Sequence, residues 1–273
     1  MRYLRLLWTL VTGALGSSKS IATLQHGMAT LNAIDGFMEP YRRGDYEATL
    51  QATESFRQDG DATASYCFYR GSCLAHLGRL PEAEVWLRRN IALRKEDQKR
   101  HLAIGYTTLG HLMLQAGRYD DAVECFQTSL HHFPGRSSGY RSMAEAYLLR
   151  GDNPSEALRW TSLAIDQAKG DREISPELRK MNLGESFATL AWATAAASHT
   201  APEVARLVAE AVAGVGAGSI SSTAQVHYQS GRAYEELGDA GNSLHHYREA
   251  ARLDLQGEWG RAGRAALAIG VAP

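Results

Sequence analysis

The sequence predicts an all-α protein, an α-solenoid of stacked antiparallel helix pairs with about five to six repeat units and a C-terminal capping helix. Short blocks of glycine, alanine and aromatic residues recur along the chain. Their marker glycines lie 34 residues apart, as for Gly44 and Gly78 and again for Gly117 and Gly151. Within a block, large apolar residues return every three or four positions, as on one face of a helix. One helix pair cannot bury that face alone, so neighbouring pairs must stack.

The clearest unit covers residues 103–136 and shows why each half forms a helix. Its first helix is expected over residues 103–116. Gly117 ends this helix, because glycine accepts the left-handed conformation of a C-terminal cap. One aspartate of Asp120-Asp121 then stabilises the start of the second helix, where backbone N–H groups are free. Pro134 stops the second helix because proline lacks the N–H that would continue it.

Small residues in this unit mark the place where its two helices cross. Gly110 and Ala122 let the backbones approach closely, and Tyr106, Leu109 and Phe126 fill the space above and below. A close-packed interior requires this alternation of small and large side chains. The conspicuous glycines and alanines are therefore predicted to be packing and turn residues.

The other units repeat the pattern less regularly. In chain order they are a block at 44–48, a first full unit around 71–87, a third around 140–164, a degenerate unit at about 183–213, and a last unit around 227–250. An extra turn or a longer helix is needed around residues 95–100, because the spacing from Gly78 to Gly117 exceeds one repeat.

Two segments are predicted as connections, and a third as the end of the stack. Residues 169–176 are polar and contain a proline, which favours a long connection. Residues 214–219 are rich in glycine, which favours a flexible joint. Residues 258–269 are expected to form the capping helix, with Trp259 and Ile269 on its apolar side, because the last repeat would otherwise expose its inner face.

Two units carry a nearly complete family pattern. The second full unit has Tyr106, Leu109, Gly110, Met113, Gly117, Tyr119, Ala122, Phe126, Ser129 and Pro134 at the pattern positions. The last unit has His227, Gly231, Tyr234, Gly238, Ser243, Tyr247 and Ala250. These residues resemble the tetratricopeptide repeat family. The resemblance implies a right-handed solenoid and a protein that binds other proteins.

The resemblance also implies where partners bind. In that family the first helices of the repeats line a concave face, which holds peptides or helices. The positions to test lie three residues before and one residue after the small residue of each first helix. They are Phe68, Ser72, Thr107, His111, Arg141, Glu145, Ala188, Trp192, Tyr228 and Arg232. One subclass grips a partner's C-terminal carboxylate with lysine and asparagine at such positions, and the pairs here do not match it.

The composition is that of an ordinary globular protein. The chain has 273 residues, 44% of them hydrophobic, and a formal net charge of −1. A near-neutral charge argues against nucleic acid as a partner. Cys67, Cys73 and Cys125 do not make a disulfide framework. They are expected to be buried thiols in a reducing compartment, which favours a cytoplasmic location.

The N-terminal segment is the one compositional anomaly. Residues 1–20 combine basic residues with a short apolar run and contain no acid. The run is too short to span a bilayer as a helix. Three interpretations stay open, namely a secretion signal, a membrane-surface anchor and a helix that caps the solenoid. A single solenoid domain is expected over residues 21–270.

Several motifs that suggest chemistry are excluded by their context. Residues 135–139 match G-x-S-x-G, but a nucleophile elbow needs a preceding strand, and a helix precedes them here. Adjacent histidines, as in His131-His132 and His245-His246, point about 100° apart on a helix and make no metal face. No metal site, cofactor or catalytic residue is predicted.

The functional hypotheses follow from these exclusions. We expect a non-catalytic module or scaffold that binds a protein or peptide in the concave groove. The alternative is a membrane-associated or exported assembly factor of the cell envelope that uses residues 1–20. An enzyme or ligand sensor is the third hypothesis. The oligomeric state is left open.

Overall fold

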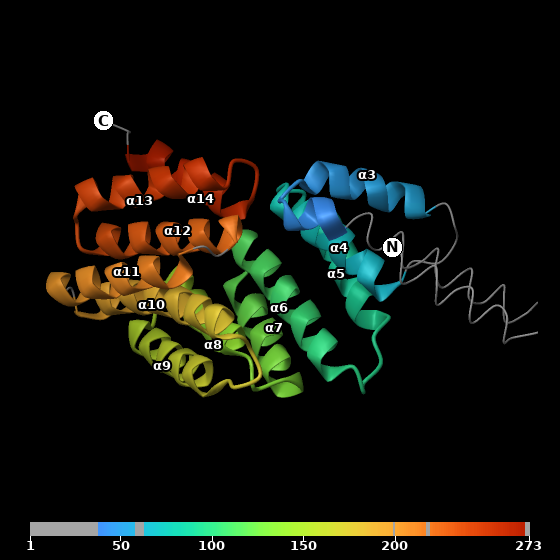
Figure 1. The fold of residues 1–273 in the computed structure, drawn as a ribbon, viewed down its shortest axis with the longest axis horizontal. Helices are drawn as coiled ribbons and strands as arrows, with labels where there is room; N and C mark the ends of the chain where they lie inside the picture. Colours follow the sequence, from blue (N-terminus) through green and yellow to red (C-terminus); the bar gives the residue numbers. More distant parts are fainter. Residues whose placement is uncertain (1–37, 58–62, 199, 217–218, 271–273) are drawn as a thin grey trace, which may run out of the picture. The chain divides into compact units, whose positions relative to one another are not determined.

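The computed structural model describes residues 38–57, 63–198, 200–216 and 219–270, and these residues are predominantly helical (Figure 1). The segment 1–20 lies outside them. The chain divides into two compact bodies, here called the N-terminal body (Met1–Ala62) and the repeat body (Thr63–Pro273). The all-α repeat fold predicted from the sequence is confirmed. The handedness of the solenoid stays a prediction.

The described part of the N-terminal body shows how the block at 44–48 is used. A short helical segment at 38–42 is followed by Gly44, whose φ is 75°, and by helix α3, Tyr46–Arg57. Asp45 caps α3, because its Oδ1 accepts a hydrogen bond from the Ala48 N–H at 3.0 Å. The block is therefore the turn before a helix, as in the later repeats.

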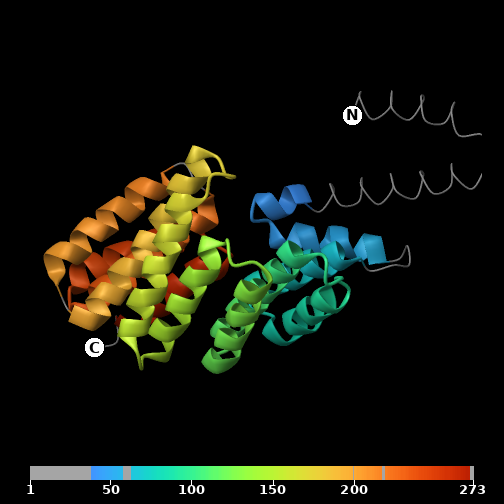
Figure 2. The ribbon, with the colours of Figure 1, turned by 90° about the horizontal axis from the view of Figure 1, so that it is seen from below.

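The repeat body stacks helix pairs in sequence order, and the described residues form five pairs and a final helix (Figure 2). The pairs are α4 (Ala64–His76) with α5 (Leu80–Ala92), α6 (Lys99–Gln115) with α7 (Tyr119–His132), α8 (Ser137–Arg150) with α9 (Pro154–Gly170), α10 (Pro176–Ser198) with α11 (Ala201–Val215), and α12 (Ile220–Glu236) with α13 (Ala240–Leu253). The final helix is α14, Glu258–Gly270.

The first and second helices of the pairs have different neighbours. Successive first helices touch only slightly at α4 and α6 and pack more closely along the chain toward α10 and α12, whereas successive second helices hardly touch. The first helices therefore line one side of the stack, and they are α4, α6, α8, α10 and α12. We call this side the groove.

The turn inside each pair follows the predicted cap. Gly117 adopts a φ of 72°, in the left-handed region that favours glycine. Its N–H donates to the Leu114 carbonyl at 3.0 Å, and the Arg118 N–H donates to the Met113 carbonyl at 2.9 Å. These two bonds satisfy carbonyl groups that the end of α6 would otherwise leave unpaired.

The small residues lie at the helix crossings, as the sequence predicts. A Cβ added at Gly110 would overlap the buried ring of Phe126. A Cβ at Gly231 would lie 2.6 Å from Tyr247 in the last pair. Both aromatic residues are almost fully buried. The glycine of the first helix and the aromatic ring that faces it from the second helix thus set the distance between the two helices of a pair.

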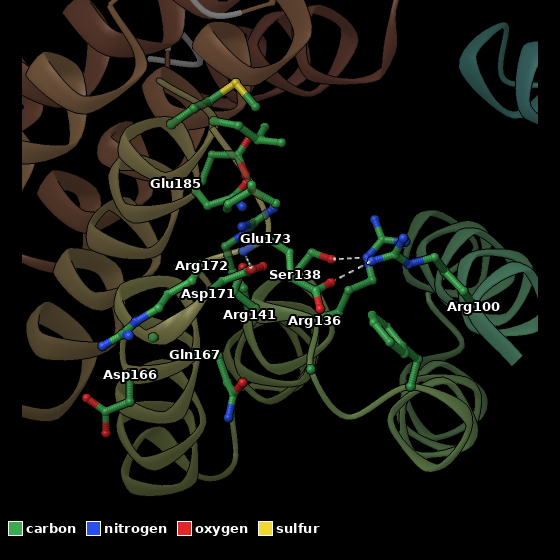
Figure 3. Close-up of a pocket in the computed structure, with 18 of the residues that line it drawn as sticks. Arg100, Arg136, Ser138, Arg141, Asp166, Gln167, Asp171, Arg172, Glu173 and Glu185 are labelled. Atoms are coloured by element: carbon green, nitrogen blue, oxygen red, sulfur yellow. Dashed lines mark hydrogen bonds and ion pairs between the residues drawn. The ribbon is translucent and has the colours of Figure 1, made fainter. Parts of the chain in front are cut away.

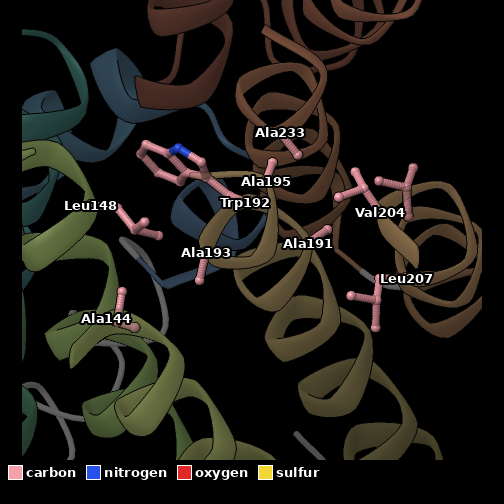
Figure 4. Packing of buried hydrophobic residues seen from close by; sticks show 11 residues of the cluster. Ala144, Leu148, Ala191, Trp192, Ala193, Ala195, Val204, Leu207 and Ala233 are labelled. Atoms are coloured by element: carbon pink, nitrogen blue, oxygen red, sulfur yellow. The ribbon is translucent and has the colours of Figure 1, made fainter. Parts of the chain in front are cut away.

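The largest fully buried side chain of the described residues is Trp192, in the cluster between α8, α10, α11 and α12 (Figure 4). Small side chains surround it, including Ala144 of α8 and Ala233 of α12, while Val204 and Leu207 of α11 pack in the same cluster. Burying a side chain of this size removes a large apolar area from water, which stabilises the stacking of successive pairs.

The two predicted connections are shorter than the sequence suggested. Helix α9 continues to Gly170 and α10 begins at Pro176, so the connection is 171–175 rather than 169–176. Gly214 lies in α11 and packs against Gly184 of α10, where a Cβ would lie 2.6 Å from the Gly184 Cα. The glycines at 184 and 214 allow α10 and α11 to cross closely. A glycine-rich sequence alone does not show whether its glycines form a helix crossing or a flexible joint. The predicted longer helix near 95–100 is α6, which begins at Lys99.

The final helix α14 is held at its start by one carboxylate. Asp254 accepts hydrogen bonds from the N–H groups of Gly257 at 3.0 Å and Trp259 at 3.1 Å. Trp259 is buried as expected, but Ile269 is 77% exposed, so the predicted apolar side is covered only at its beginning. Arg261 donates to the Ala75 carbonyl at the end of α4 over 3.2 Å, which connects the two ends of the repeat body.

Candidate partner-binding groove

Every predicted groove residue lies on a first helix, but the structure divides them by burial. Phe68, His111, Tyr228 and Arg232 are partly exposed. The others are buried, and these are Ser72, Thr107, Arg141, Glu145, Ala188 and Trp192. A buried side chain cannot be a primary contact for a partner. The four partly exposed residues are therefore the reachable members of the set.

Thr107 and Ser72 serve packing within the helix pairs. The Thr107 hydroxyl forms a hydrogen bond with the Ser129 hydroxyl of α7 at 2.8 Å, and Ser129 donates to the Ala103 carbonyl. Ser72 is 3% exposed. Because their polar atoms face the protein interior, these two positions shape the groove without lining its surface.

His111 connects two neighbouring first helices. Its Nε2 forms a hydrogen bond with the Ser142 hydroxyl of α8 at 3.0 Å. Its ring packs edge to face on Phe126, with ring centroids 5.2 Å apart. Burial, together with the positive charge of Arg141, lowers the pKa of His111 to about 4. The imidazole is therefore neutral near pH 7 and acts as a structural link.

A buried ion pair joins α8 to α10. Arg141 Nη2 lies 2.7 Å from Glu185 Oε2, and both side chains are more than nine-tenths buried. Sequence reasoning identified Arg141 but missed Glu185. The two residues are 44 positions apart, and their pairing depends on how one repeat stacks on the next. Removing either partner of such a pair would leave an uncompensated buried charge, which is strongly destabilising.

A carboxyl group lies on the floor of the groove beside this pair. Glu145 is 3% exposed, and burial raises its pKa to about 7, although Arg141, the Gln229 amide and Arg232 act in the opposite direction. Gln229 is itself held by the Thr189 hydroxyl, which donates to Gln229 Oε1 at 3.1 Å. The groove therefore has a polar, buried floor shared by α8, α10 and α12.

Two of the reachable residues, Tyr228 and Arg232, belong to an aromatic and arginine cluster on α12. The Arg232 guanidinium lies over the Trp192 ring, 4.7 Å from its centroid, and Arg232 Nε lies 3.1 Å from Glu235 Oε2. Tyr228 packs against Tyr247 and Trp259 at centroid distances of 5.8 and 5.6 Å. These contacts hold both side chains in defined positions at the groove surface.

The final helix forms one wall of a small cavity in the groove. The cavity has a volume of about 340 Å³, and its lining includes Glu145, Leu149, Tyr228, Glu258 and Trp259. Burial raises the pKa of Glu258 to about 8, and the charge of Glu145 adds to the shift. Helix α14 thus covers part of the surface that the sequence assigned to a partner, because it occupies the place of a further first helix.

A larger cavity of about 1040 Å³ lies at the beginning of α8 and α10 (Figure 3). Arg100, Arg136 and Arg141 are among its lining residues. Sequence reasoning treated 135–139 as an inter-repeat turn, so Arg136 was not considered as a binding residue. The position of Arg136 just before a helix was the sequence feature that could have indicated a binding role.

The described residues were compared with the requirements of a metal site and of a membrane-spanning helix. Among them, no three histidine, cysteine, aspartate or glutamate side chains gather as metal ligands would. None of the described helices combines the length and apolar character needed to cross a bilayer. Of the histidine pairs, His246 is buried and its Nδ1 lies 2.9 Å from His227 Nδ1.

Comparison with known proteins gives one family. Three models of the tetratricopeptide repeat match residues 61–134, 107–172 and 224–256, which together span more than half of the chain. No curated protein matches the sequence.

Solved structures with a similar fold have low sequence identity. The MamA protein is 14% identical over 69% of this chain and 93% of its own, with a TM-score of 0.48. BtubC (BKLC) from P. vanneervenii is 17% identical over 89% and 92%, with a TM-score of 0.46. A putative kinesin light chain of Podosopora anserina with nearly identical TPR-like repeats is 20% identical over 68% and 92%, with a TM-score of 0.44.

Proposed function

Because this chain belongs to the tetratricopeptide repeat family, we propose that its repeat body is a non-catalytic scaffold that binds a segment of a partner protein in the groove. The observation that carries the proposal is the pair Tyr228 and Arg232. Both are partly exposed on a first helix, and both are held in place by aromatic neighbours. Tyrosine and arginine are the side chains that most often anchor protein interfaces.

The rigid support of these two side chains favours binding. A free arginine or tyrosine loses rotamer freedom when a partner immobilises it, which costs about 0.5–1.5 kcal/mol per side chain. Arg232 is already restrained by Trp192, Glu235 and Glu236. Much of this loss is therefore incurred on folding, and less remains to oppose association.

The test is affinity capture with the full chain, followed by mass spectrometry of the bound proteins. Wild type is compared with the double variant Tyr228→Ala/Arg232→Ala. The matched control is Tyr119→Ala/Arg206→Ala, which removes the same residue types from the second helices α7 and α11. Melting curves check that each variant is folded. We expect the groove variant alone to lose a partner, and an unchanged partner list would reject the groove assignment.

A location in the cytoplasm is the accompanying proposal. Its alternative, a membrane-associated or exported assembly factor, depends on residues 1–20, whose basic and apolar composition motivates it. Cell fractionation together with mass spectrometry of the mature N-terminus separates the two. An intact N-terminus in the soluble fraction supports the cytoplasm, whereas a cleaved or membrane-bound form supports the alternative.

A further inference from the structure

The larger cavity combines parts of several repeats at one end of the groove. Its walls come from α6, the turn before α8, the end of α9, the connection 171–175 and the beginning of α10. Figure 3 shows Arg100 and Arg136 approaching the start of α8 near Ser138. The volume of about 1040 Å³ is large enough for a side chain of another molecule together with part of its backbone.

Arg136 is the unusual residue of this cavity. Its Nε donates to the Ser138 hydroxyl at 3.1 Å, yet no carboxylate of the described residues forms an ion pair with it. Burial, aided by the positive charges of Arg141 and Arg100, lowers the pKa of Arg136. The Arg136 residue is partly buried. Partial burial of a guanidinium without an anionic partner costs free energy, which a bound anion would offset.

The two neighbouring arginines have partners but keep donors unused. Arg141 pairs through Nη2 with Glu185, while its Nη1 is buried and has no hydrogen-bond partner. Arg100 lies over the Phe133 ring, 5.0 Å from its centroid, and reaches Glu173 only at 3.7 Å between two exposed side chains. Such an exposed pair contributes little and exchanges readily with another anion.

The start of α8 adds backbone donors to the same place. Arg136 is the residue before the helix, and its side chain does not cap the helix. The first turn contains no acidic residue. Its free N–H groups and the positive end of the helix dipole therefore favour a negative charge at this point.

The carboxylates in the cavity do not cancel this local preference. Glu185 is bound by Arg141, and the Asp171 Oδ1 accepts the Glu173 N–H at 3.0 Å. Four arginines and four acidic residues line the cavity, so recognition must come from local donor geometry rather than from a general positive field. The lining arginines are Arg100, Arg136, Arg141 and Arg172, and the acids are Asp166, Asp171, Glu173 and Glu185.

We propose that this cavity binds a phosphate monoester, with Arg136 as the main contact, Arg100 beside it and the N–H groups at the start of α8 as further donors. A monoester presents three terminal oxygens and close to two negative charges at pH 7, whereas a carboxylate presents two oxygens and one charge. Planar guanidinium groups bind such oxygens in pairs. The two guanidinium groups and the backbone N–H groups together offer more hydrogen-bond donors than one carboxylate can accept.

The source of the phosphate is either a phosphorylated side chain of the partner or a free phosphate ester. The first case rests on the proposed function, since the cavity continues the groove through Arg141. The experiment uses four probes on the full chain, namely phenyl phosphate, a glycine–serine peptide with one phosphoserine, the same peptide unphosphorylated, and the same peptide with glutamate. Calorimetric titration gives affinities, and amide chemical shifts of Ser137 and Ser138 report the place.

The expected result is saturable binding of both phosphate probes with shifts at Ser137 and Ser138. Arg136→Ala should weaken that binding about tenfold or more, the usual effect of removing a hydrogen bond to a charged group. Arg136→Lys should retain part of it, because charge remains while the planar fork is lost. Arg206→Ala is the matched control, since it removes an arginine paired only within α11.

Several results would overturn the proposal. They are absence of saturable phosphate binding, equal binding of the glutamate peptide, or equal loss in Arg206→Ala. Tighter binding of the phosphopeptide than of phenyl phosphate assigns the source to a partner, and the reverse order assigns it to a small ester.

The folding of the variant gives an independent readout. If Arg136 has a structural role, Arg136→Ala should lower the melting temperature, which contradicts the proposal. If it is kept for a ligand, removal of this unpaired, partly buried charge should leave stability unchanged or higher.

The outcome is separable from that of the proposed function. Loss of a partner in Tyr228→Ala/Arg232→Ala without any phosphate binding leaves the scaffold standing and rejects the phosphate site. Phosphate binding that depends on Arg136, with no partner affected by the groove variant, supports the phosphate site and rejects the assignment of the groove at Tyr228 and Arg232.

Discussion

Two glycines of the same repeat, Gly110 and Gly117, are required for different physical reasons. At Gly110 the backbone is an ordinary helix, but a Cβ would overlap the Phe126 ring. At Gly117 nothing lies within 4 Å of an added Cβ, but the φ of 72° strains any other residue. One position is therefore constrained by its neighbours and the other by its own backbone.

This difference can be measured. Gly110→Ala should lower the free energy of unfolding by about 1–3 kcal/mol through overpacking. Gly117→Ala should lower it by about 1–2 kcal/mol through the left-handed backbone. In urea titrations combined as a double-mutant cycle with Phe126→Leu, only the Gly110 change should couple to residue 126. Equal coupling for both glycines would contradict the distinction.

The same contrast explains what the sequence could predict at single residues. Gly110, Gly117 and Phe126 were predictable because their roles repeat at a fixed spacing and depend on local geometry. The role of Arg136 was not predictable, because it depends on residues of other repeats that reach the same cavity. A pattern repeated along the chain reports the shared fold, whereas a site arises where the repeats differ.

At the scale of elements, α14 depends on a single carboxylate. Asp254 accepts three backbone N–H groups, those of Gly257, Trp259 and Gly260, at 3.0 to 3.3 Å. This arrangement satisfies the donors that a helix start leaves free. The helix in turn supplies Trp259, which packs on Tyr228 in the groove. The cap and the groove are therefore linked through one short connection.

Asp254→Ala should destabilise α14 by about 1–2 kcal/mol, the usual cost of losing an N-cap acceptor. Hydrogen exchange should become faster across 258–270, and Tyr228 should become more exposed. Asp97→Ala is the control, because Asp97 is exposed on the connection before α6. If exchange in α14 stays at the wild-type rate, Asp254 does not hold the helix.

Element boundaries show the limits of composition as a guide. The capping helix was predicted because apolar residues recur beyond the last repeat. The joint at 214–219 was misread in part, since Gly214 is a helix-crossing residue whose partner, Gly184, is 30 positions earlier along the chain. A glycine in a flexible loop and a glycine at a close contact between two helices cannot be told apart from the sequence.

At the scale of the whole molecule, burial shifts the pKa values of histidines and glutamates in opposite directions. Burial lowers the pKa of His76, His111 and His246 to about 4. It raises the pKa of Glu145 to about 7 and that of Glu258 to about 8. The folded state therefore binds fewer protons than the unfolded chain at the histidines and more protons at the glutamates.

The signs of these shifts predict a stability maximum. Between pH 4 and 6.5 the histidines raise the free energy of unfolding as pH increases. In this range they are protonated in the unfolded chain and neutral in the folded protein, so raising the pH destabilises only the unfolded chain. From pH 4.5 upward the glutamate contributions fall, and they are lost between pH 7 and 8 as the folded carboxyls ionise. Melting temperature should thus peak near pH 6.5 and decline toward pH 8.

The decline of the melting temperature above pH 6.5 is attributed to Glu145 and Glu258. Each glutamate lowers the free energy of unfolding by up to about 1.4 kcal/mol per pH unit within its window. Glu145→Gln/Glu258→Gln should flatten the decline between pH 6.5 and 8, and Glu96→Gln on the exposed connection should not. Melting curves at half-unit pH steps check this. A decline that persists in the double variant would place its origin elsewhere.

The hydrogen bond from Arg261 to the Ala75 carbonyl joins residues that are 186 positions apart. Most other packing in the repeat body is between helices that are one or two elements apart along the chain. Arrays of such local contacts fold quickly, because closing the short loops between them costs little entropy. The contact between the ends can form only after the intervening pairs are in place. It therefore belongs to the late part of folding, and its loss should speed unfolding while leaving the folding rate unchanged. Through Arg261, the first and last helices of the repeat body contact each other directly, so separating these two helices requires this hydrogen bond to break.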